Sequence, residues 1–225
     1  MTFPAVQARS YTTWPGPAPA FSHAIALPSS IVAGELLLVV ALSRSGTVAS
    51  MSASAGWTEV FDSTATGGTL AAYWKIAEGA DTLTISMSGS ERIAYNCWRI
   101  GGGKTVTAAA MTSGSSDYPS PPNHAPGAGV KDFLWIAAAG YLSTATTAYA
   151  AFPGGYTSTR NAPASTNGGA DVTLLGVCEK TTTASNEAPG VFSGHVGAPS
   201  EWWVAQTLAV HPASKGGAIF MGAGL

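Results

Sequence analysis

The sequence predicts an all-β protein, an antiparallel β-sandwich of jelly-roll type. Short segments of alternating apolar and polar residues recur along the chain, separated by turn residues about every ten positions, which is typical of sandwiches. No stretch combines a helical period with capping residues. With 225 residues, the chain is long enough to bury a substantial core in one large sandwich.

Residues 1–20 are expected to form an extended N-terminal arm. The run that begins at Trp14 contains three prolines at alternate positions. Because proline fixes φ and lacks an amide donor, this run cannot lie inside a sheet, although a short strand over residues 6–13 fits before it. The sandwich itself is expected over residues 21–212, beginning with an edge strand at 21–27.

The segment from Leu36 to Leu42 is expected to be a central strand. Its residues are apolar on both faces, so that it needs cover above and below the sheet. Period-two alternation and turn residues then predict further strands over residues 58–63, 69–77, 81–88, 92–100 and 105–111.

Residues 113–129, rich in Ser and Pro, form the main break in the pattern. We expect a long surface loop here rather than an interdomain linker, because neither half alone has enough strands for a sandwich. After the loop, strands are expected over residues 132–141, 156–160, 172–180, 190–194 and 202–210. Residues 213–225 are expected to form a C-terminal tail.

The order of motifs in the first half returns in the second, which predicts an internal duplication of residues 21–112 and 130–212. The pairs of corresponding residues are Glu35 with Asp132, Trp57 with Tyr156, Lys75 with Lys180, and Glu91 with Glu201. A steady order with small loop insertions is expected of two similar β-meanders. Chance similarity among strands of simple composition is the alternative.

Charge is sparse in this chain and argues against several classes of partner. Charged residues make up 10% of the sequence and the net charge is −2, whereas about a quarter is usual in globular proteins. There is no basic footprint for nucleic acid and no Lys/Arg cluster for an anionic membrane. The longest aliphatic run is too short to span a bilayer, and residues 1–6 do not resemble a secretory signal. We expect a protein that packs against neighbouring proteins.

No motif predicts an enzyme, a cofactor or a metal site. Gly103-Lys104-Thr105 ends like a phosphate-binding loop, but Trp98 stands where that loop needs glycine, so a turn between strands is expected. The four histidines lie far apart in the sequence, and no Gly-x-Ser-x-Gly is present. The carboxylates fall mostly at expected strand ends, where only distance in space could identify a catalytic pair.

The two cysteines, Cys97 and Cys178, lie within expected strands. We expect buried free thiols in a protein made in a reducing cytoplasm, with a disulfide as the alternative.

Two groups of apolar residues are candidates for contacting a partner. The tail carries Ile219, Phe220, Met221 and Leu225 after a glycine-containing hinge, and we expect it to dock on a neighbouring subunit; folding back on its own domain is the alternative. Adjacent aromatic residues in a strand point to opposite faces, so one member of each pair should face outward. The candidate surface aromatics are Trp14, Trp74 and Trp202.

Several strand and turn motifs resemble those of bacteriophage virion proteins of jelly-roll type. In the first half they are Leu27-Pro28, Gly34 to Val39, Gly56-Trp57-Thr58 and Tyr73-Trp74-Lys75, and in the second Pro153 to Thr157, Glu187 to Phe192 and Trp203-Val204-Ala205. The resemblance implies a virion component, either a head decoration or a tail-associated protein, made in the host cytoplasm. It brings no active site.

From this resemblance we expect a non-enzymatic capsid decoration protein. Its expected partners are the major capsid protein or neighbouring copies, with a homo-oligomer on the particle surface. Sparse charge suits a closely packed surface layer, and the shaft repeats of long fibres are missing from the sequence. The alternative is a tail-fibre, receptor-binding or carbohydrate-binding module that contacts a host-surface glycan.

Overall fold

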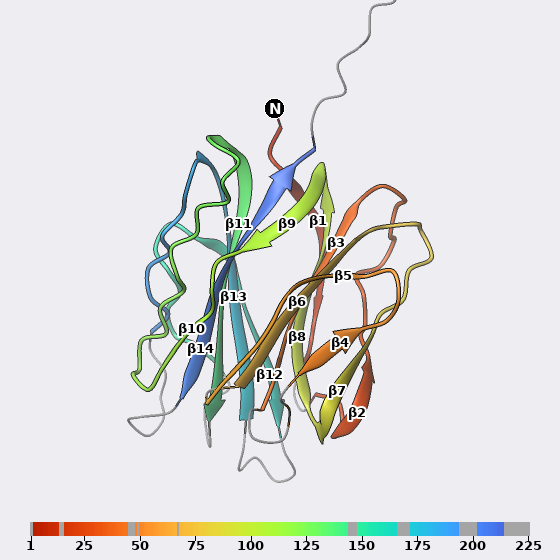
Figure 1. Ribbon diagram of the computed structural model, residues 1–225, viewed down its shortest axis with the longest axis vertical. Helices are drawn as coiled ribbons and strands as arrows, with labels where there is room; N and C mark the ends of the chain where they lie inside the picture. Colours follow the sequence, from red (N-terminus) through yellow and green to blue (C-terminus); the bar gives the residue numbers. More distant parts are fainter. Residues whose placement is uncertain are drawn as a thin grey trace, which may run out of the picture.

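The computed structural model describes residues 2–13, 16–44, 48, 50–66, 68–143, 148–165, 172–193 and 202–213. Within these residues the chain forms fourteen β-strands in three antiparallel sheets, and no helix (Figure 1). The predicted all-β antiparallel sandwich is therefore confirmed.

Each of the two main sheets is built from one half of the chain. The first sheet has the order β1 (Ala5–Tyr11), β8 (Ile93–Gly101), β3 (Leu36–Ser43), β6 (Gly68–Ile76), β5 (Thr58–Ala65). The second sheet has the order β10 (Thr112–Gly114), β14 (Trp203–Pro212), β11 (Lys131–Ser143), β13 (Val172–Ala184), β12 (Thr157–Ser165), and β9 (Gly103–Ala108) also pairs with β14. The third sheet is small, with the order β2 (Ala20–Ala24), β7 (Thr84–Glu91), β4 (Met51–Ala53). The jelly-roll type stays a prediction.

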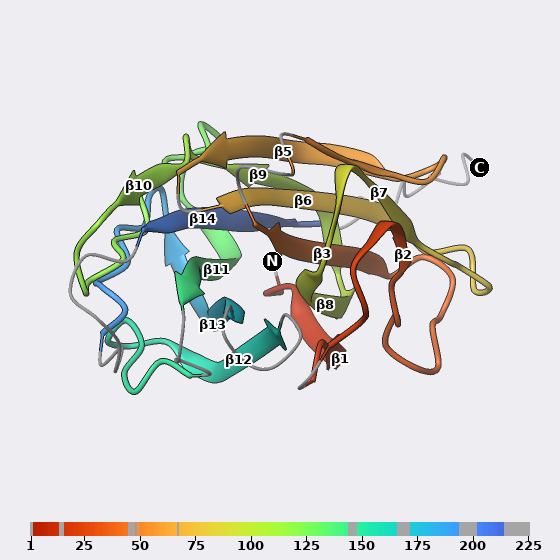
Figure 2. The ribbon, with the colours of Figure 1, turned by 90° about the horizontal axis from the view of Figure 1, so that it is seen from below.

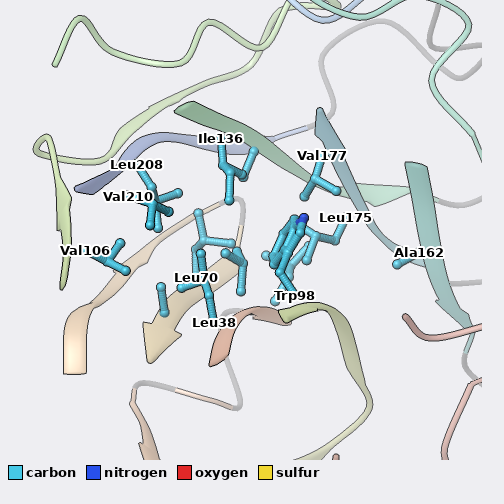
Figure 3. Close-up of a cluster of buried hydrophobic side chains, with 14 of the residues drawn as sticks. Leu38, Leu70, Trp98, Val106, Ile136, Ala162, Leu175, Val177, Leu208 and Val210 are labelled. Carbon is cyan, nitrogen blue, oxygen red and sulfur yellow. The ribbon is translucent and has the colours of Figure 1, made fainter. Parts of the chain in front are cut away.

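The main hydrophobic core lies between the first and second sheets (Figures 2 and 3). Because side chains alternate along a strand, every second residue of β3 points into this core, beginning with Leu36. Figure 3 shows how the two sheets meet: the first contributes Leu38, Leu70 and Trp98, and the second contributes Ile136, Val177 and Leu208. The halves of the chain therefore share one core.

The third sheet covers the outer face of the first sheet. Val39 and Tyr73 point to this side and pack with Ile25, Met51 and Ile85. β3 is therefore buried on both faces, as its continuous apolar sequence predicts.

Loops cover the outer face of the second sheet. Phe133 and Trp135 from β11 pack there with Tyr149, Tyr156 and Phe192 from the connecting segments. The loop before β11 belongs to this cover, because the backbones of His124 and Glu187 form an isolated bridge. The loop expected over residues 113–129 therefore contacts the second half of the chain, and its role as a loop rather than a linker stays a prediction.

One expected strand is confirmed and one is corrected. The short strand expected over residues 6–13 is β1, which pairs with β8. The strand expected over residues 190–194 is replaced, in its described part, by an isolated bridge between Ser193 and Ala151. Pro189 lacks an amide donor and Gly190 has no side chain to pack, so both residues disfavour a strand that starts here.

When the strands of each half are numbered in chain order, the two main sheets have the same order of strands across the sheet. The pairs of equivalent strands are β1 with β9, β3 with β11, β5 with β12, β6 with β13, and β8 with β14. The packing is reciprocal as well, because β13 lies over β3 and β8 while β6 lies over β11 and β14. The equivalent units therefore start at β1 and β9, earlier than residues 21 and 130.

The pairing register also agrees between the sheets. Leu36 pairs with Ile76 and Ile100, and Leu134 pairs with Thr181 and Val210. The expected matches of Lys75 with Lys180 and of Glu91 with Glu201 make the pairing partners of Leu36 equivalent to those of Leu134. Leu36 is therefore equivalent to Leu134, whereas the expected match of Glu35 with Asp132 would make it equivalent to Phe133, one residue earlier. The ladders of β5 with β6 and of β12 with β13 also shift register at equivalent positions. This agreement is what an internal duplication predicts.

Replacing Gly176 with alanine is expected to destabilise the fold by about 1–3 kcal/mol through overpacking. A Cβ at this position of β13 would collide with the ring of Tyr149. That ring cannot retreat, because it is fixed between Tyr141, Phe152 and Phe192, with ring centroids 5.7, 6.1 and 5.1 Å away. Urea denaturation measures the loss.

The control is Gly154→Ala, at a turn position where a Cβ would meet nothing within 4 Å. This variant is expected to unfold within about 0.5 kcal/mol of the unmodified protein. Equal stability of the two variants would show that Tyr149 does not fill this part of the core tightly.

Candidate functional site

The most connected polar cluster centres on Glu179, a buried residue in the middle of β13 (4% exposed). Its Oε1 accepts hydrogen bonds from Arg9 Nε (2.8 Å), Trp98 Nε1 (2.6 Å) and Arg160 Nη2 (2.8 Å). Its Oε2 accepts from Arg9 Nη2 at 2.5 Å. Arg160 also lies over the ring of Trp98, 5.1 Å from its centroid, and donates from Nε to Asn96 Oδ1. We call these five residues the Glu179 cluster.

The Glu179 cluster holds an ionised carboxylate between two cations. Burial would raise the pKa of Glu179, but the hydrogen bond from Arg9, the charge of Arg160 and the bond from Trp98 outweigh it and lower the pKa. Burial lowers the pKa of Arg160, although arginine stays protonated in proteins. A carboxylate that accepts four hydrogen bonds is a poor proton acceptor, so the geometry favours binding and bracing over acid–base catalysis.

The Glu179 cluster joins the two main sheets. Arg9 and Trp98 belong to β1 and β8 of the first sheet, whereas Arg160 and Glu179 belong to β12 and β13 of the second. A cavity of about 250 Å³ opens beside it. Its lining residues are Phe3, Pro4, Ala5, Val6, Arg9, Leu134, Thr157, Ser158, Glu179, Lys180 and Thr181.

A larger groove of about 700 Å³ lies between residues 24–31 and 79–84. The titratable residue in its lining is Asp81, which forms an ion pair with Lys75 Nζ at 2.8 Å and accepts from the backbone amides of Glu78 and Gly79. This carboxylate stabilises the turn between β6 and β7, which leaves the groove without a free reactive group among its described lining residues.

Two histidines meet through a threonine, although the sequence suggested four isolated ones. Thr107 Oγ1 on β9 lies 3.0 Å from His124 Nε2 and 2.9 Å from His211 Nε2. Burial lowers both pKa values, and the charges of His211 and Lys131 lower those of His124 and His211 respectively. The two neutral rings fasten the loop before β11 to β9 and β14. In the described part of the chain, no three His, Cys, Asp or Glu side chains gather as a metal site would require.

The cysteines are buried free thiols, as expected. Cys97 packs beneath the third sheet and Cys178 beneath the loops on the opposite outer face. Burial raises the pKa of both thiols, so neither is a ready nucleophile. Gly103-Lys104-Thr105 was expected to be a turn between strands; these residues begin β9, and the turn lies one residue earlier, at Gly102.

Three exposed apolar side chains belong to the loop at residues 116–119 or to segments that contact it. They are Tyr118 (57% exposed), Val191 (44%) and Trp202 (48%). The neighbouring Trp203 donates from Nε1 to Ser116 Oγ at 3.3 Å, and the amide of Phe192 donates to the carbonyl of Pro119 at 2.9 Å. We call Tyr118, Val191 and Trp202 the loop-end patch; β10 and β14 lie beside each other at this end of the molecule (Figure 1).

The expected surface aromatics have different outcomes. Trp202 faces solvent and Trp203 is buried, in agreement with the expected alternation. The expectation is wrong for Tyr73 and Trp74: Tyr73 is buried beneath the third sheet, and Trp74 is half-buried against the main core. Both faces of the first sheet are covered, so neither ring is left outside. Trp14 and the tail residues Ile219, Phe220, Met221 and Leu225 lie outside the described residues.

The Glu179 cluster was not predicted from the sequence. Carboxylates were expected mostly at strand ends, whereas Glu179 follows the buried apolar run of β13 without a break in the strand. Its partner Arg9 lies 170 positions away in the sequence. The one local signal is a charged residue directly after a continuous apolar run, which indicates a buried and paired charge.

In comparisons with protein-family models, with curated proteins and with solved structures, no match was found. The resemblance to phage virion proteins therefore stays a prediction. The described residues include no helix of the length and apolarity that crossing a bilayer requires.

Replacing Glu179 with glutamine is expected to lower the free energy of unfolding by about 3–5 kcal/mol at pH 7, because the largely buried Arg160 and the partly exposed Arg9 lose their counter-charge. The folded-state pKa of Glu179 is lowered, so its contribution is present above the unfolded pKa of about 4.3 and is lost as pH falls through the folded pKa. The difference between variant and unmodified protein should therefore shrink below about pH 4. Urea denaturation over a pH series measures it.

The control is Glu78→Gln. Glu78 pairs with Lys75 at 3.1 Å, but its side chain is 79% exposed. A much smaller loss is expected, because solvent screens an exposed ion pair. If both variants lost the same small amount of stability, the Glu179 cluster would not hold the sheets together.

Proposed function

We propose that this protein is a non-enzymatic structural component of a bacteriophage particle, in which it decorates the capsid by binding the major capsid protein or neighbouring copies. The observation that carries the proposal is that polar groups suited to chemistry are buried, whereas several apolar side chains are exposed. Glu179, His124 and His211 are bonded to partners inside the fold, the thiols of Cys97 and Cys178 are buried, and the loop-end patch leaves aromatic and aliphatic side chains exposed.

The buried reactive groups are occupied with holding the structure together. Glu179 joins the two main sheets, and the pair of His124 and His211 fastens a loop. The thiols of Cys97 and Cys178 are inaccessible and have raised pKa values. An active site needs a poised acid, base or nucleophile within reach of substrate, and none of these groups meets that need.

The loop-end patch has the composition of a protein-binding surface. Tyr and Trp are enriched at interfaces, where they bury a large area at a low cost in side-chain entropy. Charged residues make up 10% of the chain, so that few charges oppose desolvation when a neighbour packs on the surface. The particle as the setting rests on the sequence resemblance.

Glycan binding is the second candidate function. The exposed ring of Tyr118 directly follows Ser115, Ser116 and Asp117 in the loop, and the exposed ring of Trp202 precedes Trp203, which bonds to Ser116. Aromatic faces beside hydroxyl and carboxylate groups suit stacking against a sugar ring with hydrogen bonds at its edge. A tail-associated receptor-binding module would use the patch in this way.

The double variant Tyr118→Ala/Trp202→Ala is expected to bind at least about tenfold more weakly to phage particles that lack the protein, because buried aromatic anchors dominate interfaces. Purified full-length chains are added to the particles, and co-sedimenting protein is quantified by mass spectrometry of gradient fractions. The control is Phe21→Ala, which removes an equally exposed ring (63%) from the third sheet. A second variant that ends at residue 213 tests the tail separately.

Absence of the protein from purified particles would contradict a virion role. If the unmodified protein binds a glycan array and the Trp202→Ala variant does not, the second candidate replaces the first. If Phe21→Ala weakens particle binding as much as the double variant, the contact lies on another face.

A further inference from the structure

The sandwich has two lateral seams, where an edge strand of one sheet meets an edge strand of the other. At the first seam β1 approaches β12 (Figure 2), and Arg9 Nη2 lies 3.3 Å from Ser158 Oγ. At the second seam β9 approaches β5. Because β1 is equivalent to β9 and β12 to β5, the two seams occupy equivalent places, and one serves as an internal reference for the other.

The two seams are filled by different chemistry. Thr157 pairs with Glu179 as Thr58 pairs with Trp74, and the pairs after the register shift likewise match Arg160 with Phe61. At the second seam, Trp74 and Phe61 pack against the main core. At the first seam, the same two positions hold a buried carboxylate and a buried guanidinium. The fold therefore does not require charge at these positions.

The charged arrangement also carries costs that the aromatic one avoids. Removing two ions from water costs several kcal/mol, and a hydrophobic pair of similar volume is often as stable as the ion pair or more so. Ser158 adds backbone strain, because its φ is +51°, a left-handed conformation that non-glycine residues adopt rarely. Strain and desolvated charge persist together at sites where they serve binding.

The cavity at the first seam fits a small amphipathic anion. Its apolar lining includes Phe3, Val6 and Leu134, and its polar lining includes Arg9, Thr157 and Ser158. Arg9 and Arg160 surround the single carboxylate of Glu179, which leaves one surplus positive charge. Arg9 donates from Nε and Nη2 to Glu179 and from Nη2 to Ser158, and its side chain is 32% exposed.

We propose that this cavity binds a monoanionic carboxylate attached to a short apolar group, with Arg9 as the anion contact. A dianionic phosphate fits less well, because Glu179 lies beside the same guanidinium. With about 250 Å³, the cavity is smaller than the sites that hold drug-sized ligands, which limits the apolar group to a few carbon atoms. The carboxylate could come from a free short-chain acid or from the end of a polypeptide chain.

Titration of the ¹³C-methyl-labelled full-length protein with sodium hexanoate tests the proposal. We expect saturable shifts at the methyl groups of Val6 and Leu134, with a dissociation constant of about 1 mM. Val106, the equivalent of Val6 at the second seam, should not shift. Hexan-1-ol, which has the same chain without the charge, should bind at least about tenfold more weakly. A parallel titration with N-acetyl-Ala-Leu distinguishes the two sources of the carboxylate by which ligand binds more tightly.

Two variants locate the site. Arg9→Met removes the anion contact and should weaken hexanoate binding at least about tenfold. Because Arg9 also braces Glu179, Ala5→Phe provides a second variant, which fills the cavity and leaves Arg9 and Glu179 in place; it too should abolish the shifts. The control is Lys104→Met, which removes an exposed cation from β9 and should leave binding unchanged.

Three results would overturn the proposal: the absence of saturable shifts at Val6 and Leu134, equal affinity for hexanoate and hexan-1-ol, or unchanged binding by a folded Ala5→Phe variant. The titration uses the isolated protein, so its outcome does not depend on whether the chain decorates a particle.

Discussion

The inner faces of the two main sheets leave water only by packing against each other, and this mutual burial determines most other features. Each half of the chain supplies one sheet, so the largest apolar surfaces of residues 5–101 and of residues 103–212 are partners. The outer faces are then closed by different means, a small third sheet on one side and loops on the other.

Much of the fold could be predicted because alternation of side chains is a local property. The apolar run of β3 indicated cover on both faces, and the alternation at Trp202 and Trp203 indicated one inward ring. What covers a given face is not local. Trp74 was expected outside and Tyr73 inside, but Trp74 packs against the main core, and the third sheet, formed from distant segments, buries Tyr73 on the outer face. The strand expected over residues 190–194 failed for a local reason, since Pro189 and Gly190 pair poorly.

The candidate sites were harder to predict than the strands. The partners of Glu179 come from positions 9, 98 and 160, and no sequence spacing brings these together. The meeting of His124 with His211 through Thr107 has the same origin, because antiparallel pairing of β9 with β14 sets Thr107 opposite Ala209, two residues from His211, whose ring reaches the Thr107 hydroxyl. A motif search detects groups that lie on one loop or one helix, whereas a sandwich assembles its polar groups across strands and between sheets. Register decides which groups meet.

The difference between the two seams shows what a repeated unit allows. If both seams were filled by aromatic side chains, either edge of one sheet could pack against either edge of the other. The positions of Glu179 and Arg160 would then hold the same residues as those of Trp74 and Phe61. The Glu179 cluster removes this ambiguity: Glu179 buried against the aromatic seam would leave its carboxylate without Arg9, at a cost of several kcal/mol. Charge at one seam therefore specifies which edges meet, even where it adds little net stability. The aromatic seam contributes packing that does not distinguish between edge strands, whereas the charged seam favours one pairing of edges. The cavity proposed to bind an anion lies beside this charged seam.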